Sequence, residues 1–133
     1  MREIGRGDRR MLFNQNIISE ILRSSFGDKI EAFTDDCVME LDDYELADLF
    51  EETIDFAILY GIDEIEVEEY RVEEVGEGQK VSGTLEIMAV VDGFERIEEE
   101  SEFRDTGTIA FGAGFSFHVE EGVYSDLELE YLY

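Results

Sequence analysis

Carboxylates at alternate positions are the side chains of this sequence that could most readily do chemistry. The stretch EIEVEEYRVEEVGEG, residues 64–78, holds seven glutamates and one arginine, with apolar residues in roughly every second place. This spacing predicts a β-strand, on which side chains two residues apart lie about 6.6–6.8 Å apart on one face. Glu64, Glu66 and Glu68 therefore form a row of like charges that could bind cations or a cationic surface.

Catalytic patterns are missing around these acids. A glycosidase needs a pair of carboxyl groups in a protected cleft, but 36 acidic residues place some pair at any chosen spacing. The only histidine, His118, is far along the chain from the only cysteine, Cys37, and FGAG (residues 111–114) lacks the lysine and following helix of a phosphate-binding loop. We therefore expect no enzymatic activity, and we interpret Cys37 as a small buried hydrophobic residue.

Metal binding is the next chemistry that acidic segments suggest. The segment DDCVMELDD lacks the central glycine of an EF-hand loop, and DGFERIEEESE misplaces it. Loose condensation of Ca²⁺ or Mg²⁺ on an acidic face would be nonspecific. The sequence therefore predicts no dedicated metal site and no cofactor.

The net charge of −26 is the most unusual property of the chain, and it is unevenly distributed. Residues 1–29 carry a net charge of +2, whereas residues 30–133 carry −28. Such a body repels phosphate and anionic membranes, so direct binding to nucleic acid or lipid is disfavoured and basic proteins are the expected partners. The lone cysteine and the lack of a long apolar segment predict a cytoplasmic protein.

The chain length of 133 residues predicts one domain, spanning residues 1–133, with residues 1–13 as a flexible basic arm. Arg2, Arg6, Arg9 and Arg10 could fold back onto the acidic body, reach an acidic patch of a partner, or have no role. Apolar periodicity predicts helices over 14–26 and 43–60, the second starting with a capping box at Asp42 and Glu45. Residues 28–41 fit a strand or a helical turn equally well.

A two-residue period follows Gly61 and predicts strands. The parity changes near Glu68 and Glu69, which indicates a β-bulge. The segments GEGQ, VDGF (residues 91–94) and DTG indicate turns, VDGF as a type I′ hairpin. The predicted fold is α+β, with two N-terminal helices packed on one face of a five-stranded antiparallel sheet, and with a largely carboxylate face toward water.

Ordinary explanations of the charge are a solvated surface, a salt-loving host and a need for solubility. A solvated surface usually mixes signs, but residues 30–133 contain only four basic residues. Glutamates are twice as numerous as aspartates, which we do not expect of a salt-loving composition. The charge also exceeds several-fold what the solubility of a small domain requires. The carboxylates themselves are therefore interpreted as the surface that binds a partner.

In size, charge and α+β content the chain resembles the small acidic DNA-mimic inhibitors of phages and mobile elements, of the anti-restriction and anti-CRISPR type. The resemblance implies a non-enzymatic inhibitor that mimics phosphate charge and binds the nucleic-acid-binding groove of a host defence nuclease, such as a CRISPR effector or restriction nuclease. The alternative is an acidic module that binds another basic partner protein. A homodimer through the C-terminal strand DLELEYLY is also compatible with the sequence. The predicted partner-binding residues are Glu64, Glu66, Glu68, Glu128, Glu130, Asp48, Glu51, Glu52 and Asp55.

Overall fold

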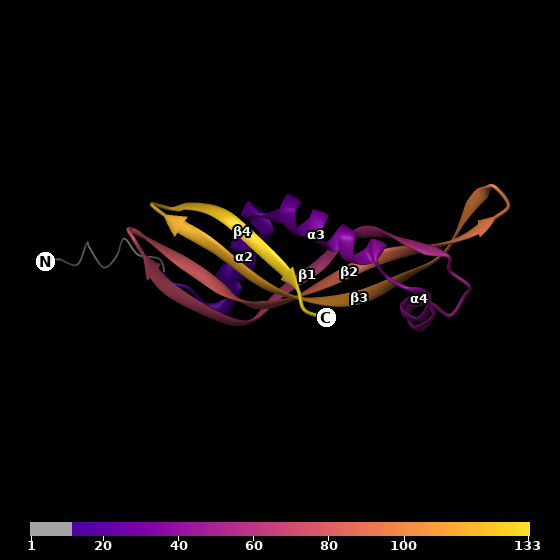
Figure 1. Ribbon diagram of the computed structural model, residues 1–133, viewed down its shortest axis with the longest axis horizontal. Coiled ribbons are helices and arrows are strands. Elements are labelled where there is room, and N and C mark those ends of the chain that lie inside the picture. Colours follow the sequence, from indigo (N-terminus) through magenta and orange to yellow (C-terminus); the bar gives the residue numbers. More distant parts are fainter. Residues whose placement is uncertain (1–11) are drawn as a thin grey trace, which may run out of the picture.

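The computed structural model describes residues 12–133, and in this range three helices lie on one face of a four-stranded antiparallel sheet (Figure 1). The elements are, in chain order, α2 (Gln15–Ser25), α3 (Gly27–Met39), α4 (Asp43–Leu49), β1 (Phe56–Val75), β2 (Gly78–Ile97), β3 (Glu100–Glu120) and β4 (Val123–Tyr131). The strands form a meander in the order β1-β2-β3-β4. The α+β class is as predicted.

The predicted number of five strands is wrong, because two expected turns lie inside continuous strands. Gly93 of the expected VDGF hairpin is part of β2, and Gly107 of DTG is part of β3. A Cβ atom at Gly93 would lie 3.0 Å from the ring of Phe50, and one at Gly107 would lie 3.2 Å from Leu49. These glycines therefore allow close packing beneath the end of α4, and the chain reverses at Glu98, which has a positive φ of 61°.

The predicted helix over 43–60 is also wrong beyond its first two turns. Its capping box is present, because Asp42 accepts a hydrogen bond from the Glu45 amide and Glu45 accepts one from the Asp42 amide. The helix ends at Leu49, and Phe50 is extended and buried. From Phe56 onward the backbone pairs with β2, so a long-range ladder replaces the helix that the local apolar period predicted.

The two earlier segments also form helices, so the structure has three helices where two were predicted. The helix predicted over 14–26 is confirmed as α2, and the Asn14 side chain caps it by accepting from the Ile17 amide at 2.8 Å. Most of the stretch over 28–41, which the sequence left open, belongs to α3. Within the described residues, no helix combines the length and the apolar composition needed to cross a bilayer.

All three helices pack on the same face of the sheet, which we call the inner face. Near α2 and the start of α3, the core includes Ile18, Leu22, Ile30, Leu85 and Phe117. Near α4 and the end of α3, it includes Val38, Leu46, Phe50, Val91 and Phe111. Alternation along the strands leaves the residues of the other parity on the opposite side, which we call the outer face.

A β-bulge in β1 fixes which side chains reach the outer face. The strand register shifts between Val67 and Glu69, which confirms the predicted bulge. The bulge brings the backbone of β1 against Gly83 of β2, where a Cβ atom would lie 2.0 Å from the carbonyl oxygen of Glu69. Only glycine fits at this position without movement of the backbone.

Replacing Gly83 by alanine is therefore expected to lower the free energy of unfolding by about 1–3 kcal/mol, as overpacking does elsewhere. The matched control is Gly61→Ala in β1, because a Cβ atom there has nothing within 4 Å. That variant should be unchanged or stabilised by up to about 1 kcal/mol. Urea unfolding followed by circular dichroism measures both effects. Equal stability of Gly83→Ala and the wild type would contradict the proposed steric role.

Side chains of the helices cap backbone carbonyls along the two outer strands. Gln15 donates to the carbonyl of Glu68 at 2.9 Å, and Arg23 donates to that of Asp63 at 3.4 Å. Lys29 donates to the carbonyl of Leu127 on β4. Such caps oppose strand pairing with another chain. β4 lies at the border of the sheet, which a homodimer through the C-terminal strand would require.

Candidate functional site

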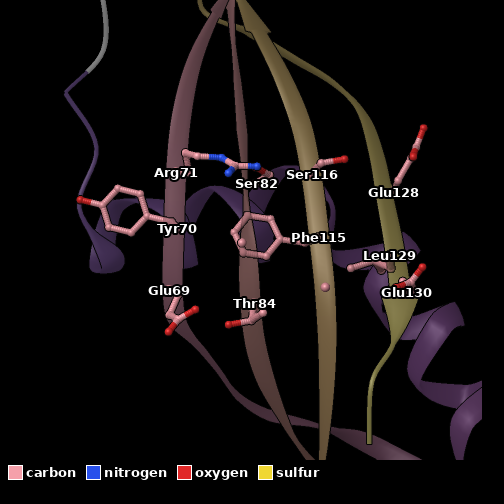
Figure 2. A pocket seen from close by; sticks show the side chains of 12 residues that line it. Glu69, Tyr70, Arg71, Ser82, Thr84, Phe115, Ser116, Glu128, Leu129 and Glu130 are labelled. Atoms are coloured by element: carbon pink, nitrogen blue, oxygen red, sulfur yellow. The ribbon is translucent and has the colours of Figure 1, made fainter.

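A shallow trough of about 570 Å³ lies on the outer face, where all four strands run side by side (Figure 2). Its floor consists of small side chains from the two central strands, namely Ser82, Thr84, Gly114 and Ser116. Small residues are needed here because larger ones would fill the space between the outer strands. The trough is therefore a direct result of the residues that alternate with the core positions of β2 and β3.

The strand register places charged groups at both sides of this floor. One row across the sheet joins Glu69, Thr84, Gly114 and Glu130, and the next joins Arg71, Ser82, Ser116 and Glu128. Figure 2 shows Glu69 and Arg71 on β1, and Glu128 and Glu130 on β4, at opposite sides of the trough. With neighbouring strands about 4.8 Å apart, the two sides are about 14 Å apart.

The predicted acidic row on β1 continues this border along the strand. Ile65 and Val67 are buried in the core, so Glu64 and Glu66 point to the outer face. The carboxylate of Glu68, at the bulge, accepts a hydrogen bond from the Tyr133 hydroxyl at 3.4 Å. Carboxylates are therefore concentrated on the outer strands, with Glu86 and Asp92 on the central strand β2, and small or apolar side chains occupy much of the rest of the outer face. This corrects the expectation of a largely carboxylate face.

The second predicted group, the acids of the helix over 43–60, does not form a row on a helix. Asp48 is exposed on α4, but Glu51 and Glu52 lie in the connection after it. Asp55 also precedes β1, and its carboxylate accepts a hydrogen bond from the Arg96 amide at 2.6 Å. The helix ends at Leu49, before three of these four acids, so they form no row on a helix, and none of the four lines the trough.

Few cations neutralise the predicted carboxylates. Among residues 12–133, the ion pairs are those of Arg71 with Glu73 and of Arg104 with Glu95 and Glu102. None of the nine predicted partner-binding acids takes part in these pairs, and all nine are exposed. Arg2, Arg6, Arg9 and Arg10 of the predicted arm lie outside the described residues.

Tyr133 reports the negative potential of the outer face. Its ring lies over Gly112, where a Cβ atom would approach the ring to 2.4 Å. The charge of Glu68 is the main cause that raises the pKa of the Tyr133 phenol, followed by burial and the charge of Glu86. Removing the phenol proton would add one more negative charge beside two others, so this surface favours cations.

The structure also bears on metal binding and on nucleophilic catalysis by Cys37. Within the described part of the chain, no three His, Cys, Asp or Glu side chains are placed to hold a metal ion together. Cys37 is buried, and burial, with smaller effects of Glu40 and Asp36, raises the pKa of its thiol to about 11. The thiolate is the nucleophilic form of cysteine, so Cys37 is poorly suited to nucleophilic catalysis.

The raised pKa of Cys37 predicts slow reaction with thiol reagents in the native state. A shift from 9.0 to about 11 lowers the thiolate fraction at neutral pH by about 100-fold. Ellman's reagent should therefore react at least about 100-fold more slowly with native protein than with urea-unfolded protein at the same pH. Similar rates in the two states would show that the thiol is exposed and ionises normally.

The trough contains residues that the sequence did not single out. Glu69 was noted only as part of the bulge, and Ser82, Thr84, Gly114 and Ser116 were not proposed as binding residues. Their common signal is a run of small side chains on the parity opposite to the core of β2 and β3. The pairing of the strands was required to place them between Glu69 and Glu130.

Comparison of the chain with protein-family models, with curated proteins and with solved structures finds no match.

Proposed function

We propose that this protein is a non-enzymatic inhibitor that binds the cationic nucleic-acid-binding groove of a nuclease, such as a CRISPR effector or a restriction nuclease. The observation that carries the proposal is that two groups of exposed carboxylates on the outer strands make no ion pair with a described lysine or arginine, namely Glu64, Glu66 and Glu68 on β1 and Glu128 and Glu130 on β4. Arg71, which also lies on the β1 side, pairs with Glu73. Lysine and arginine side chains that bind phosphates would bind these carboxylates instead.

The spacing of the acids supports the mimicry of phosphate charge. Glu64 and Glu66 on β1, and Glu128 and Glu130 on β4, are each two residues apart. Two residues along a strand span about 6.6–6.8 Å, which is of the order of the distance between successive phosphates of one nucleic-acid strand. A row of such groups presents charges at intervals that a phosphate-binding groove can accept.

The length of the sheet is also suited to an extended groove. β1 and β2 each contain 20 residues, which corresponds to about 66 Å at 3.3 Å per residue. This length equals about 19 base pairs of B-form DNA at 3.4 Å per step. A rod of that length with a charge of −26 would be attracted rapidly to a long cationic groove.

The test is inhibition of DNA cleavage by a panel of purified restriction endonucleases and RNA-guided nucleases. We expect one of them to be inhibited, and an excess of uncleavable duplex to compete with the protein for the enzyme. The inhibition should weaken about tenfold or more between about 50 and 500 mM salt, because screening shortens the reach of exposed charges. Binding of the protein to the enzyme that the uncleavable duplex does not displace, or inhibition that is indifferent to salt, would contradict phosphate mimicry. Binding to a basic protein without competition by DNA would instead indicate an acidic module for another partner.

A further inference from the structure

The outer face changes character in the half of the sheet away from the trough. Three successive rows there join Glu64 to Met88, Gly61 to Val90, and Ile58 to Asp92, and a fourth joins Phe56, Phe94 and Phe103. We call the apolar side chains of these rows the apolar plate, which consists of Phe56, Ile58, Met88, Val90, Phe94 and Phe103. The rings of Phe56, Phe94 and Phe103 are in contact across β1, β2 and β3, and the other apolar side chains lie in the neighbouring rows of the same face.

The plate is only partly shielded from water. Ile58 is 50% exposed and Phe103 is 53% exposed, while the four other side chains are half-buried. The helices do not shield it, because Leu46 and Phe50 pack with Ala89 and Val91 on the inner face of the same strands. Contiguous exposed apolar surface of this kind marks an interaction site more often than isolated apolar residues do.

The charged side chains around the plate determine which kind of partner surface can bind over it. Glu64 borders Met88 at one end, and Asp92 lies between Ile58 and Thr106 within the plate. A second copy would bring the same acids together and add another charge of −26, so self-association through this face is disfavoured. The complementary surface is apolar with basic residues around it.

The contact of Arg96 with Phe56 is an example, within the chain itself, of a basic side chain that binds at the apolar plate. The Arg96 guanidinium lies 4.7 Å from the centre of the Phe56 ring, and the Phe56 and Phe94 rings are stacked at 5.3 Å. An aromatic ring attracts a cation over its face. The exposed Phe103 ring, 5.9 Å from Phe94, offers a similar face to a partner.

We propose that the apolar plate binds the apolar side of a basic amphipathic helix. Three neighbouring strands span about 10 Å, which matches the 10–12 Å diameter of a helix with its side chains. Lysines or arginines along that helix would meet Glu64 and Asp92 while its leucines cover Ile58, Val90 and Phe103. The basic character of the partner rests on the proposed function, whereas the apolar contact is a separate source of affinity.

The test uses a synthetic 18-residue Leu/Lys helix with amphipathic spacing and a scrambled peptide of identical composition. At about 0.5 M NaCl, where surface attraction is screened, the amphipathic peptide should bind at least about tenfold more tightly than the scrambled one. In ¹⁵N-labelled wild-type protein, the amide shifts should change mainly around Ile58, Val90 and Phe103. This mapping needs no substitution.

Variants give a second readout. The double variant Ile58→Ser/Val90→Ser should weaken binding of the amphipathic peptide about tenfold at high salt. The matched control is Val75→Ser/Val123→Ser, at exposed apolar positions 45% and 63% accessible beside turns at the other end of the sheet, and it should bind normally. Equal binding of both peptides, shifts confined to Glu66, Glu128 and Glu130, or a dimer that the double variant dissociates would each overturn the proposal.

The two proposals can fail separately. If the double variant still inhibits a nuclease fully and the peptide does not map to the plate, the inference about the plate fails while the proposed function stands. If the amphipathic peptide maps to the plate but no nuclease of the panel is inhibited, the plate proposal holds and nuclease inhibition is wrong.

Discussion

The triple variant Glu66→Lys/Glu128→Lys/Glu130→Lys is expected to bind a cationic partner about 100-fold more weakly than the wild type. Glu128 and Glu130 line one side of the trough, and Glu66 lies on β1 one row beyond the opposite side. None of the three makes an ion pair with the described residues. An exposed ion pair contributes about 0.2–1 kcal/mol, and reversal replaces each attraction by repulsion. Three such changes give about 2–3 kcal/mol, or about 100-fold in affinity. Titration of the partner, followed by fluorescence anisotropy, measures this change in affinity.

The control for this variant is Glu31→Lys/Glu99→Lys/Glu100→Lys, which changes the net charge equally. Glu31 is exposed on α3, and Glu99 and Glu100 are exposed at the reversal between β2 and β3, away from the trough. This control should lose only a few-fold in affinity, since its charges act from a distance and are screened. Equal losses in both variants would show that net charge alone governs binding. Wild-type affinity of the trough variant would exclude the trough.

The fold of the trough variant should remain intact. Like charges on neighbouring strands destabilise a sheet by a few tenths of a kcal/mol or more per pair, so changing some of them to lysine relieves repulsion. We therefore expect its urea midpoint to equal or slightly exceed that of the wild type. A loss of binding with unchanged stability is then a property of the surface.

Local pattern was enough to predict the α+β class, α2, the capping box of α4 and the bulge in β1. Each depends on neighbours in the sequence: Asn14 caps the helix that follows it, and the change of parity at Glu68 is visible without knowing the partner strand. The inward positions of β2 and β3 were also predictable, because alternation places Leu85 and Phe117 on the same side as the core.

The errors arose where long-range packing decides the local structure. Gly93 and Gly107 have the sequence context of turns, but they lie in strands beneath Phe50 and Leu49. The actual reversal at Glu98 contains no glycine, proline or asparagine to mark it. Two predicted reversals that do not occur, and one reversal that was not predicted, replace the expected five strands by four longer ones.

The candidate site likewise contains features that follow from local sequence pattern and features that depend on long-range strand pairing. The sequence predicted that Glu64 and Glu66 share a face, because this follows from a period of two. It could not predict that Glu130 stands opposite Glu69, since that depends on the register of three strand pairs. Glu51, Glu52 and Asp55 were assigned to a helix face that does not exist, because pairing of Phe56 with Phe94 ends the helical region early.

Phe117→Ala is expected to cause the largest loss of stability, about 3–5 kcal/mol, as for other fully buried phenylalanines. Phe117 is 0% exposed on the inner face of β3, and its ring lies 5.5 Å from Phe26 and 6.2 Å from Tyr124. Truncation leaves a cavity between the helices and the sheet. Because a domain of this size has about 5–15 kcal/mol in total, urea unfolding should show a midpoint shift that is large relative to the whole transition.

Phe103→Ala on the same strand is the matched control. Phe103 is exposed on the outer face, so this variant should lose less than about 1 kcal/mol of unfolding free energy.

Ser116, which forms part of the trough floor, is the neighbour of Phe117 in the chain and faces the other way. If the helix layer holds the sheet in the shape that presents the carboxylate borders, Phe117→Ala should weaken partner binding in proportion to the unfolded population and no further. A larger loss of binding at full occupancy of the folded state would mean that the trough changes shape when the core beneath it is loosened. Equal stability losses for Phe117→Ala and Phe103→Ala would contradict the assignment of inner and outer faces on which both proposed surfaces depend.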